Sequence, residues 1–454
     1  MRALFVAVGL TGGVAAAAPA ARVHAEALAG GYAYTVAVSL ADEVGSRVCG
    51  SAGADRAVKW ATAQLKAAGL ENVHTEAVEV PRWVRGEESA EVLTPAVHRL
   101  HVGALGGSVA TPAGGLTAEV LEVGSLAELK ALPENGAAGK IVYLHVVMKR
   151  SAGFEGYGEA VPARSQGAVA AANKGAVAVL VRSIGTGGGQ LVHTGAMRYD
   201  DSVAKIPTGA LSAEDGDLLH RLRARGPVKV RLDLSTKHEG MVKSANVVGD
   251  WKGKDRAEEI VLVGAHLDSW DLGLGALDDA AGVGMALDTV RTLSKLGLRP
   301  RRTVRVVLFM NEEFGLSGAF AYAASHAAEL GKHVAAFEAD AGAGKPTGIG
   351  VVGNAAAVKW LGGLTAPIAA LPAVRSVEEA GADLIPMRPA GVPGLAVLQD
   401  VSHYFDWHHT TADTVDKIDP AELAAASAAL ATTVFVVADA PDTLPRVPTP
   451  LKPR

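Results

Sequence analysis

The chain has 454 residues, and this length predicts two folded units plus termini rather than one small domain. Hydrophobic residues make up 49% of the sequence, enough for a large core, and 43 basic against 48 acidic residues leave a net charge of −5. No basic run is present, which argues against nucleic acid as a partner. The 53 glycines and the 5% aromatic content favour an α/β protein with many tight turns.

The first residues carry one positive charge, an apolar stretch and small residues in the order that signal peptidases cleave. We therefore assign residues 1–25 to a secretory signal, cleaved between Ala18 and Ala25, and expect a secreted or periplasmic protein. The alternative is a ragged alanine-rich terminus. No other stretch reaches ~18 uninterrupted apolar residues, so we expect no membrane span and no membrane partner. Cys49 is the single cysteine, which excludes an intrachain disulfide, and its distance from the cleavage zone argues against a lipid anchor.

Residues 26–114 are predicted to begin the catalytic domain, with helices up to Gly69 and a strand at 73–80. Residues 115–235 have a different sequence pattern, with glycine-rich loops between short strands and one helix near 168–174. We predict a small β-rich unit here, inserted into the larger domain.

Residues 236–440 alternate between strands and helices, and this pattern predicts a mostly parallel central sheet sandwiched by helices. The predicted strands are 246–250, 259–264, 303–310, 334–338 and 394–398, and the predicted helices are 279–296, about 316–330, and 420–438. The fold class is therefore α/β. Residues 441–454 form a proline-rich tail that we predict to be disordered.

The stretch 261–279 carries the strongest functional signal. His266 and Asp268 end an apolar strand two residues apart, so strand alternation points both side chains to the same side. A glycine-rich loop follows, and Asp278–Asp279 open the next helix. In open α/β sheets, ligands bind at the carboxyl ends of the strands, which is where these groups lie.

Other segments deliver acids or imidazoles to strand ends of the same predicted sheet. Taken singly, each has an ordinary explanation, such as a solvated acid pair at a helix start. The set that converges is His266 with Asp268, Asp278, Glu312–Glu313, Asp340 and His409. Mixed nitrogen and oxygen ligands suit zinc, and five ligands are too many for one tetrahedral ion. Two zinc ions that share a bridging carboxylate fit this set better.

Four motifs together resemble the di-zinc exopeptidases, which include secreted bacterial aminopeptidases and the carboxypeptidase Q type. They are H-L-D-S-W-D (266–271), L-D-D-A-A-G-V (277–283), M-N-E-E-F-G-L-S-G (310–318) and H-T-T-A-D-T (409–414). Further stretches at 81–90, 164–176, 205–208 and 296–308 are similar to the carboxypeptidase Q type, and the resemblance spans roughly residues 40–445. It implies that 115–235 is a protease-associated domain beside the active site.

The resemblance also implies a role for each site residue. His266 and Asp340 would be terminal ligands of different ions, as would Glu313 and His409. Asp278 would bridge the two ions, and its peptide bond to the next residue would be cis.

Three further residues would act around the metals. Glu312 would be the general base that takes a proton from the attacking water. The Asp268 side chain would accept a hydrogen bond from the other nitrogen of His266. Tyr404 would stabilise the oxyanion, and His408 stays open as an alternative ligand to His409.

These inferences predict a secreted zinc exopeptidase that acts on dipeptides or short peptides, with a homodimer possible. An aminopeptidase of the same family is the first alternative. A single-zinc glutaminyl cyclase and a non-catalytic binding protein on the same fold are weaker ones, because the full ligand set and Glu312 are present. We further expect the unit at 115–235 to wall the cleft, since an exopeptidase must reject the interior of long chains.

Overall fold

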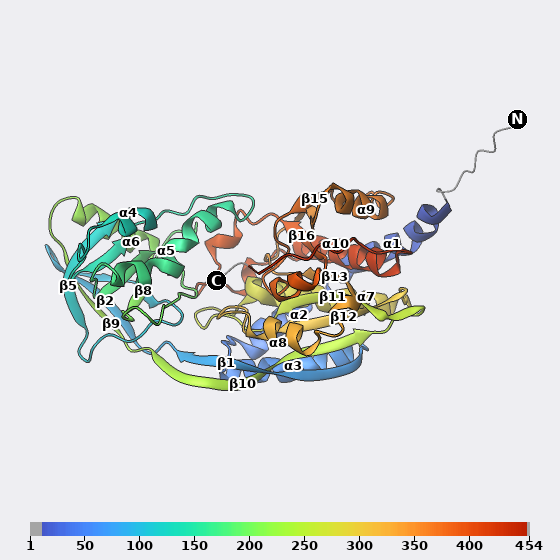
Figure 1. Cartoon of the computed structure of the whole chain (residues 1–454), viewed down its shortest axis with the longest axis horizontal. Coiled ribbons are helices and arrows are strands. Elements are labelled where there is room, and N and C mark those ends of the chain that lie inside the picture. Colours follow the sequence, from blue (N-terminus) through green and yellow to red (C-terminus); the bar gives the residue numbers. More distant parts are fainter. Residues whose placement is uncertain (1–10, 452–454) are drawn as a thin grey trace, which may run out of the picture.

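The computed structural model describes residues 11–451, and of the predicted signal peptide it describes only the part from residue 11 onward. That part belongs to helix α1 (Thr11–Gly30), which continues beyond the predicted cleavage zone. Ala20, Val23 and Ala27 on this helix are fully buried. Figure 1 shows α1 lying along α10 (Pro420–Asp439) at one end of the molecule.

The first unit is built on an eight-stranded sheet. Its strands in spatial order are β1 (Glu71–Val84), β10 (Lys237–Trp251), β12 (Arg302–Phe309), β11 (Arg256–His266), β13 (His333–Glu338), β16 (Gly394–Gln399), β14 (Pro346–Val352) and β15 (Val374–Val377). The central strands from β12 to β16 run parallel, as predicted. β10 is antiparallel to both neighbours, and β14 is antiparallel to β16, so the sheet as a whole is mixed.

Helices cover both faces of this sheet, as the alternating pattern predicts. In β11, Val261, Val263 and Ala265 face the larger apolar core, whereas Leu262 faces the smaller one. The helices of the first unit that bury side chains in the larger core are α1, α2 (Tyr32–Val38), α3 (Ala52–Ala67), α7 (Ala281–Lys295), α9 (Ala355–Thr365) and α10. The smaller core lies under α8 (Ser317–Ser325) and the short helix η4 (Ile385–Ala390).

Two C-terminal elements bear on the expectations from the sequence. Helix α10 is long and apolar enough to cross a membrane, although 83% of its most apolar window is buried inside the protein, as in a core helix. The tail beyond it has no regular secondary structure up to residue 451, but it is tied to the first unit. Leu444 is buried, and the Arg446 guanidinium donates hydrogen bonds to the carbonyls of Leu330, His333 and Ala390. The prediction that the whole tail is disordered is therefore wrong for this part.

The second unit is built on another eight-stranded sheet. Its order is β3 (His98–Leu100), β2 (Glu88–Thr94), β9 (Lys229–Leu234), β5 (Leu116–Val123), β6 (Ile141–Leu144), β7 (Ala178–Arg182), β8 (Thr208–Leu211) and β4 (Val102–Ala104). The strands from β5 to β8 are parallel. Helices α4 (Leu126–Ala131), α5 (Glu155–Ala172) and α6 (Ala213–Arg223) complete the unit, and the helix expected at 168–174 is the end of α5.

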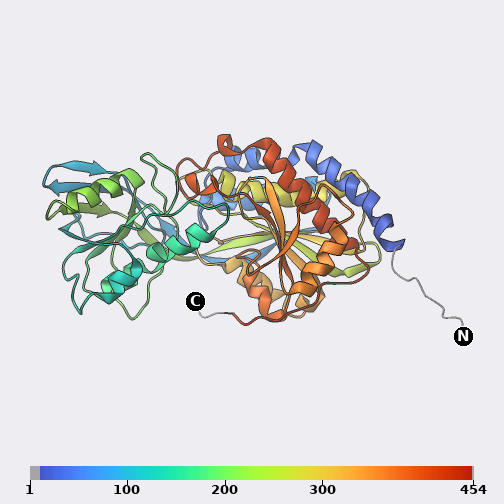
Figure 2. The same cartoon turned by 90° about the horizontal axis from the view of Figure 1, so that it is seen from above.

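Because β2, β3 and β4 belong to this second sheet, the predicted start of the inserted unit at residue 115 is too late. The short strands at 88–104 carry no composition that separates them from the strand before them, so the boundary was not visible along the chain. The long strands β1 and β10 pair antiparallel and join the two units (Figure 1). Viewed from above, the second unit lies to one side of the first, with the connecting loops between them (Figure 2).

Candidate metal centre

The carboxyl ends of the central strands bring the predicted ligands together. β11 ends at His266, which is in register with Phe309 of β12, and Gly264 is in register with Glu338 of β13. Glu312–Glu313 and Asp340 follow those two neighbouring strands within a few residues. The predicted convergence at one sheet edge is therefore found in the structure.

Asp278 lies at the centre of this cluster. Its Oδ1 is 2.9 Å from Nε2 of His266, and its Oδ2 is 3.2 Å from Nε2 of His409. Nε2 of His266 also lies 3.6 Å from Oδ1 of Asp340, while Nε2 of His409 lies 3.1 Å from Oε2 of Glu313. The Asp278 carboxylate thus lies between two pairs of side chains, each made of one imidazole and one carboxylate.

These distances change the expected division of ligands between two ions. The expectation placed His266 and Asp340 on different ions, and Glu313 and His409 likewise. The structure instead groups His266 with Asp340, and His409 with Glu313, on opposite sides of Asp278. The order of ligands along the chain does not encode this pairing, because strand order in the sheet differs from sequence order.

Asp279 is a member of the site to which the sequence analysis gave no role. The Asp278–Asp279 peptide bond is cis, as the resemblance implied. The Asp279 side chain accepts hydrogen bonds from the backbone N–H groups of His266 (3.1 Å) and Gly282 (3.0 Å). One of its oxygens also lies within 4.8 Å of ligand atoms of His266 and Asp340. Its place in the paired-aspartate motif was the available signal.

The Asp268 carboxylate has different hydrogen-bond partners from the one predicted. Nδ1 of His266 donates to the backbone carbonyl of Asp268 at 3.0 Å, and the Asp268 carboxylate lies farther away at 3.8 Å. The carboxylate instead accepts the backbone N–H groups of Asn311, Glu312 and Glu313. It therefore positions the loop that carries the predicted base and a predicted ligand.

His408 and His409 lie side by side, with ring centroids 3.5 Å apart. Nε2 of His408 is 3.4 Å from Oδ2 of Asp278, slightly farther than that of His409. His409 alone of the two is also paired with Glu313. Burial and the neighbouring His409 lower the pKa of His408 well below its ordinary value.

The sequence analysis gave no role to two supporting residues. The fully buried Arg47 guanidinium donates to the carbonyls of Leu267, Leu274 and Gly275, which border the glycine-rich loop. The Asp413 carboxylate accepts the N–H groups of Leu277 and Asp278. Asp413 stood in the last motif as a signal, whereas no pattern in the sequence marked Arg47.

The second unit contributes directly to the site. The backbone carbonyl of Thr194 lies 3.3 Å from Nδ1 of His409, so that nitrogen can donate while Nε2 faces the carboxylates. Arg164, on α5, donates to the same carbonyl at 3.0 Å and to the hydroxyl of Tyr157 at 2.7 Å. Gly195 has φ +122°, and a Cβ there would lie 2.6 Å from both the Arg164 guanidinium and the His409 ring.

The electrostatics of the cluster fit bound cations. Burial raises the pKa of Glu312 well above its ordinary value, and the carboxylates of Asp340 and Glu313 raise it further. Burial and nearby carboxylates act in the same direction on Asp279. Within residues 11–451, Oε1 of Glu313 is buried without a hydrogen-bond partner. So many buried acids are costly unless cations are present, and imidazole with carboxylate is a ligand set that zinc accepts.

A cleft of about 480 Å³ opens beside the cluster. Asp278, Glu312 and Tyr404 line it from the first unit, and Tyr157 and Met197 line it from the second. Tyr404 is nearly buried in the short helix η5 (Tyr404–Asp406). Burial, reinforced by the carboxylate of Asp278, raises the pKa of Tyr404 well above its ordinary value, so its hydroxyl keeps its proton.

Known proteins are similar to this chain in both sequence and fold. The family description "Peptidase family M28" matches residues 246–434. Mouse carboxypeptidase Q is 39% identical over 411 residues, covering 90% of this chain and 86% of that protein. The crystal structure of a peptidase M28 precursor from Shewanella amazonensis superposes with a TM-score of 0.92 at 39% identity, covering 97% of this chain and 100% of that one. The zinc aminopeptidase of Bacillus subtilis shares the fold, with a TM-score of 0.68 at 21% identity over 93% of this chain and 98% of that one. The chain therefore belongs to peptidase family M28.

Proposed function

We propose that this metallopeptidase is a secreted two-zinc exopeptidase of the carboxypeptidase Q type, which hydrolyses dipeptides and short peptides. The observation that carries the proposal is Asp278, whose two oxygens face two separate imidazole and carboxylate groups at the base of a cleft. The 39% identity to mouse carboxypeptidase Q supports the same activity class.

Each residue of the site would have a distinct role. His266 and Asp340 would hold one zinc, Glu313 and His409 the other, and Asp278 both. When bound, the two ions supply an activated water and polarise the scissile carbonyl. Glu312 accepts the proton of the attacking nucleophile, since it lines the cleft on the loop that the Asp268 carboxylate holds in place. Tyr404, which keeps its proton, donates to the developing oxyanion.

The second unit would act as a protease-associated domain that limits substrate length. Tyr157 and Met197 line the same cleft as Glu312, so side chains from both units border the metal edge. Tyr157 stacks on Phe405 of the first unit, with ring centroids 4.7 Å apart, which supports a fixed wall rather than a loose flap. A cleft bordered by both units would also orient a short substrate against the metals.

The second candidate is an aminopeptidase, and it rests on the fold shared with the Bacillus subtilis zinc aminopeptidase. The two activities differ in which end of the peptide must be free. Incubating the enzyme with matched peptides that are free, N-acetylated or C-amidated, and identifying the products by mass spectrometry, separates them. We expect N-acetylated peptides to be cleaved and C-amidated peptides to be spared. The reverse result would establish the aminopeptidase, and no cleavage of any peptide by zinc-loaded protein would favour a non-catalytic binding protein.

Secretion rests on the predicted signal peptide. Ala20 and Val23 are buried in the first unit, so we propose cleavage at the early end of the predicted zone, close to Ala18, which keeps both residues. N-terminal sequencing of the mature protein tests this position. The possible homodimer stays a prediction from the sequence, and sedimentation of the purified protein tests it.

A further inference from the structure

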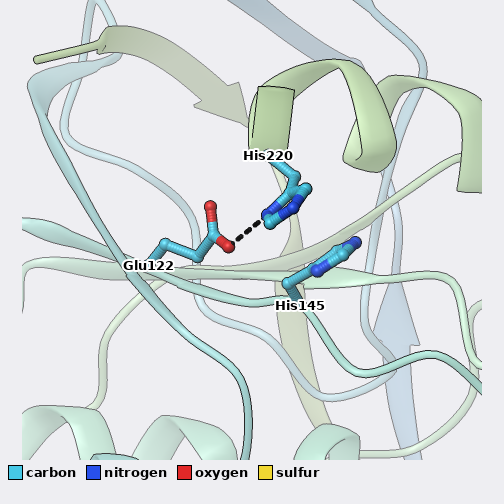
Figure 3. Close-up of side chains that lie close together, drawn as sticks. All are labelled: Glu122, His145 and His220. Atoms are coloured by element: carbon cyan, nitrogen blue, oxygen red, sulfur yellow. Dashed lines mark hydrogen bonds and ion pairs between the residues drawn. The ribbon is translucent and has the colours of Figure 1, made fainter. Parts of the chain in front are cut away.

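The second sheet has its own set of acids and imidazoles at the carboxyl ends of parallel strands. Glu122 lies near the end of β5, and His145 directly follows β6, with its N–H bonded to the carbonyl of Val123. His220 lies on α6 and reaches the same edge. Figure 3 shows the three side chains pointing toward one another from these three elements. This edge corresponds to the place where open α/β sheets bind ligands.

The three side chains lie close enough to share one ion. One ligand atom from each lies within 4.8 Å of those of the others. The rings of His145 and His220 stack, with centroids 4.2 Å apart and planes 10° from parallel. Nδ1 of His220 is 2.5 Å from Oε1 of Glu122. The other oxygen, Oε2, is buried and has no hydrogen-bond partner among the described residues, which is an unfavourable state for a carboxylate.

We propose that Glu122, His145 and His220 form a third zinc site, separate from the peptidase centre. Two imidazoles and one carboxylate are a ligand set that zinc accepts, with a fourth position left for water. The His220 side chain is 47% exposed, against 18% for Glu122, so an ion can enter from solvent. The two rings must turn out of their stacked arrangement to share the ion, because an imidazole nitrogen binds a metal in the plane of its ring and ligand atoms of one zinc lie about 3.3 Å apart.

The surroundings of His145 are those of a metal ligand. Nε2 of His145 lies 3.1 Å from Oδ1 of Asp217, which leaves Nδ1 for an ion. Asp217 is itself held by Arg182, whose Nε and Nη2 donate to its two oxygens at 2.8 and 3.1 Å. Carboxylates of this kind orient ligating histidines and raise their basicity. The ion would tie α6 to the ends of β5 and β6.

The test measures zinc per chain in the full-length protein after dialysis against a zinc-buffered solution. We expect the wild type to hold one equivalent more than His145→Ala and one more than Glu122→Gln. Because the result is a difference between variants, it does not depend on how many ions the peptidase centre binds. Asp217→Asn is expected to lower the affinity for this extra zinc ion by about 10–100-fold.

His101→Ala is the matched control, since it removes a half-exposed histidine of the same unit that pairs with Asp215 instead. This variant should keep the extra equivalent. His220→Gln, on an exposed helix face, serves where His145→Ala does not fold, and excess zinc should raise the unfolding temperature of the wild type more than that of His220→Gln. Equal zinc content in the wild type, His220→Gln and Glu122→Gln would overturn the proposal.

Discussion

The two sheets place similar side chains at equivalent edges, yet the two clusters differ in burial and in charge. At the first edge, His266 and Asp278 are 1% and 6% exposed and lie among several other carboxylates. At the second edge, one partly exposed carboxylate faces two imidazoles, and His220 is about half exposed. Buried like charges need cations to neutralise them, whereas at the second edge each imidazole already has a carboxylate partner and only Oε2 of Glu122 has none among the described residues. We therefore expect the first edge to need metal for its stability and chemistry, whereas the ion that we propose at the second edge would not be needed for the fold.

Removing all metal should have the largest effect, and it should act mainly through the first edge. We expect chelation to abolish peptide hydrolysis and to lower the unfolding temperature, because the acids around Asp278 then repel one another. Adding back two zinc equivalents should restore both properties. Full turnover by protein shown to be metal-free would contradict the proposed function.

Glu312→Gln should separate chemistry from metal binding at the first edge. Loss of a general base lowers kcat by about 10²–10⁴-fold, and zinc content should stay at the wild-type level. Glu313→Gln is the matched variant in the same loop, and it should lose zinc because its carboxylate pairs with His409. If the two variants had the same metal content, the roles assigned within this pair would be wrong.

Gly195→Ala tests whether the second unit supports the first edge. Its added Cβ would lie 2.6 Å from the His409 ring, so the ring must move away from the Thr194 carbonyl. We expect zinc affinity at the peptidase centre to fall by about 10–100-fold, measured by competition with a chromophoric chelator. Gly188→Ala lies in the same loop and meets nothing within 4 Å, so it should behave as the wild type. Equal affinity for both variants would show that this contact does not matter.

Asp288 is a buried acid of the first unit that lies away from both edges, and it shows what burial costs without a metal. Burial raises its pKa to about 6, even though Ser427 donates to it at 2.7 Å. An acid whose folded pKa is raised stabilises the fold below its unfolded pKa, and this contribution is lost as pH rises through 6. Asp288→Asn should therefore stabilise the protein at pH 8 by about 2 kcal/mol, since two pKa units correspond to about 2.7 kcal/mol at most.

Urea unfolding at two pH values measures this effect. The gain from Asp288→Asn should be present at pH 8 and absent near pH 4, where the native acid is already protonated. Asp255→Asn, an exposed acid of the same unit, controls for the change in net charge. A gain that is independent of pH would show that ionisation is not the cause.

Much of the first unit could be predicted from the sequence. The stretches 259–264 and 303–310 became parallel central strands, because buried strands have a local signature of runs rich in Val, Ile and Leu. The acids and histidines that follow those strands were visible for the same reason, since strand ends lie at one edge once the sheet is parallel. The antiparallel pairing at the margin of the sheet could not be predicted from the sequence. The reason is that β10 returns from the second unit, and its direction depends on where that unit lies.

The sequence by itself determined the fold class, the donor types and the segments that carry them, from Asp278 and Glu312 to His409. Only the tertiary structure decided how these donors pair, which backbone groups the Asp268 carboxylate holds, and where the second unit begins. It also brought the Thr194 carbonyl to His409 and gathered Glu122, His145 and His220. The physical reason is common to all of these. Strand formation and metal-ligand chemistry depend on residue type and leave a local pattern, whereas contacts between distant segments, above all those to backbone carbonyls and N–H groups that every residue has, leave none.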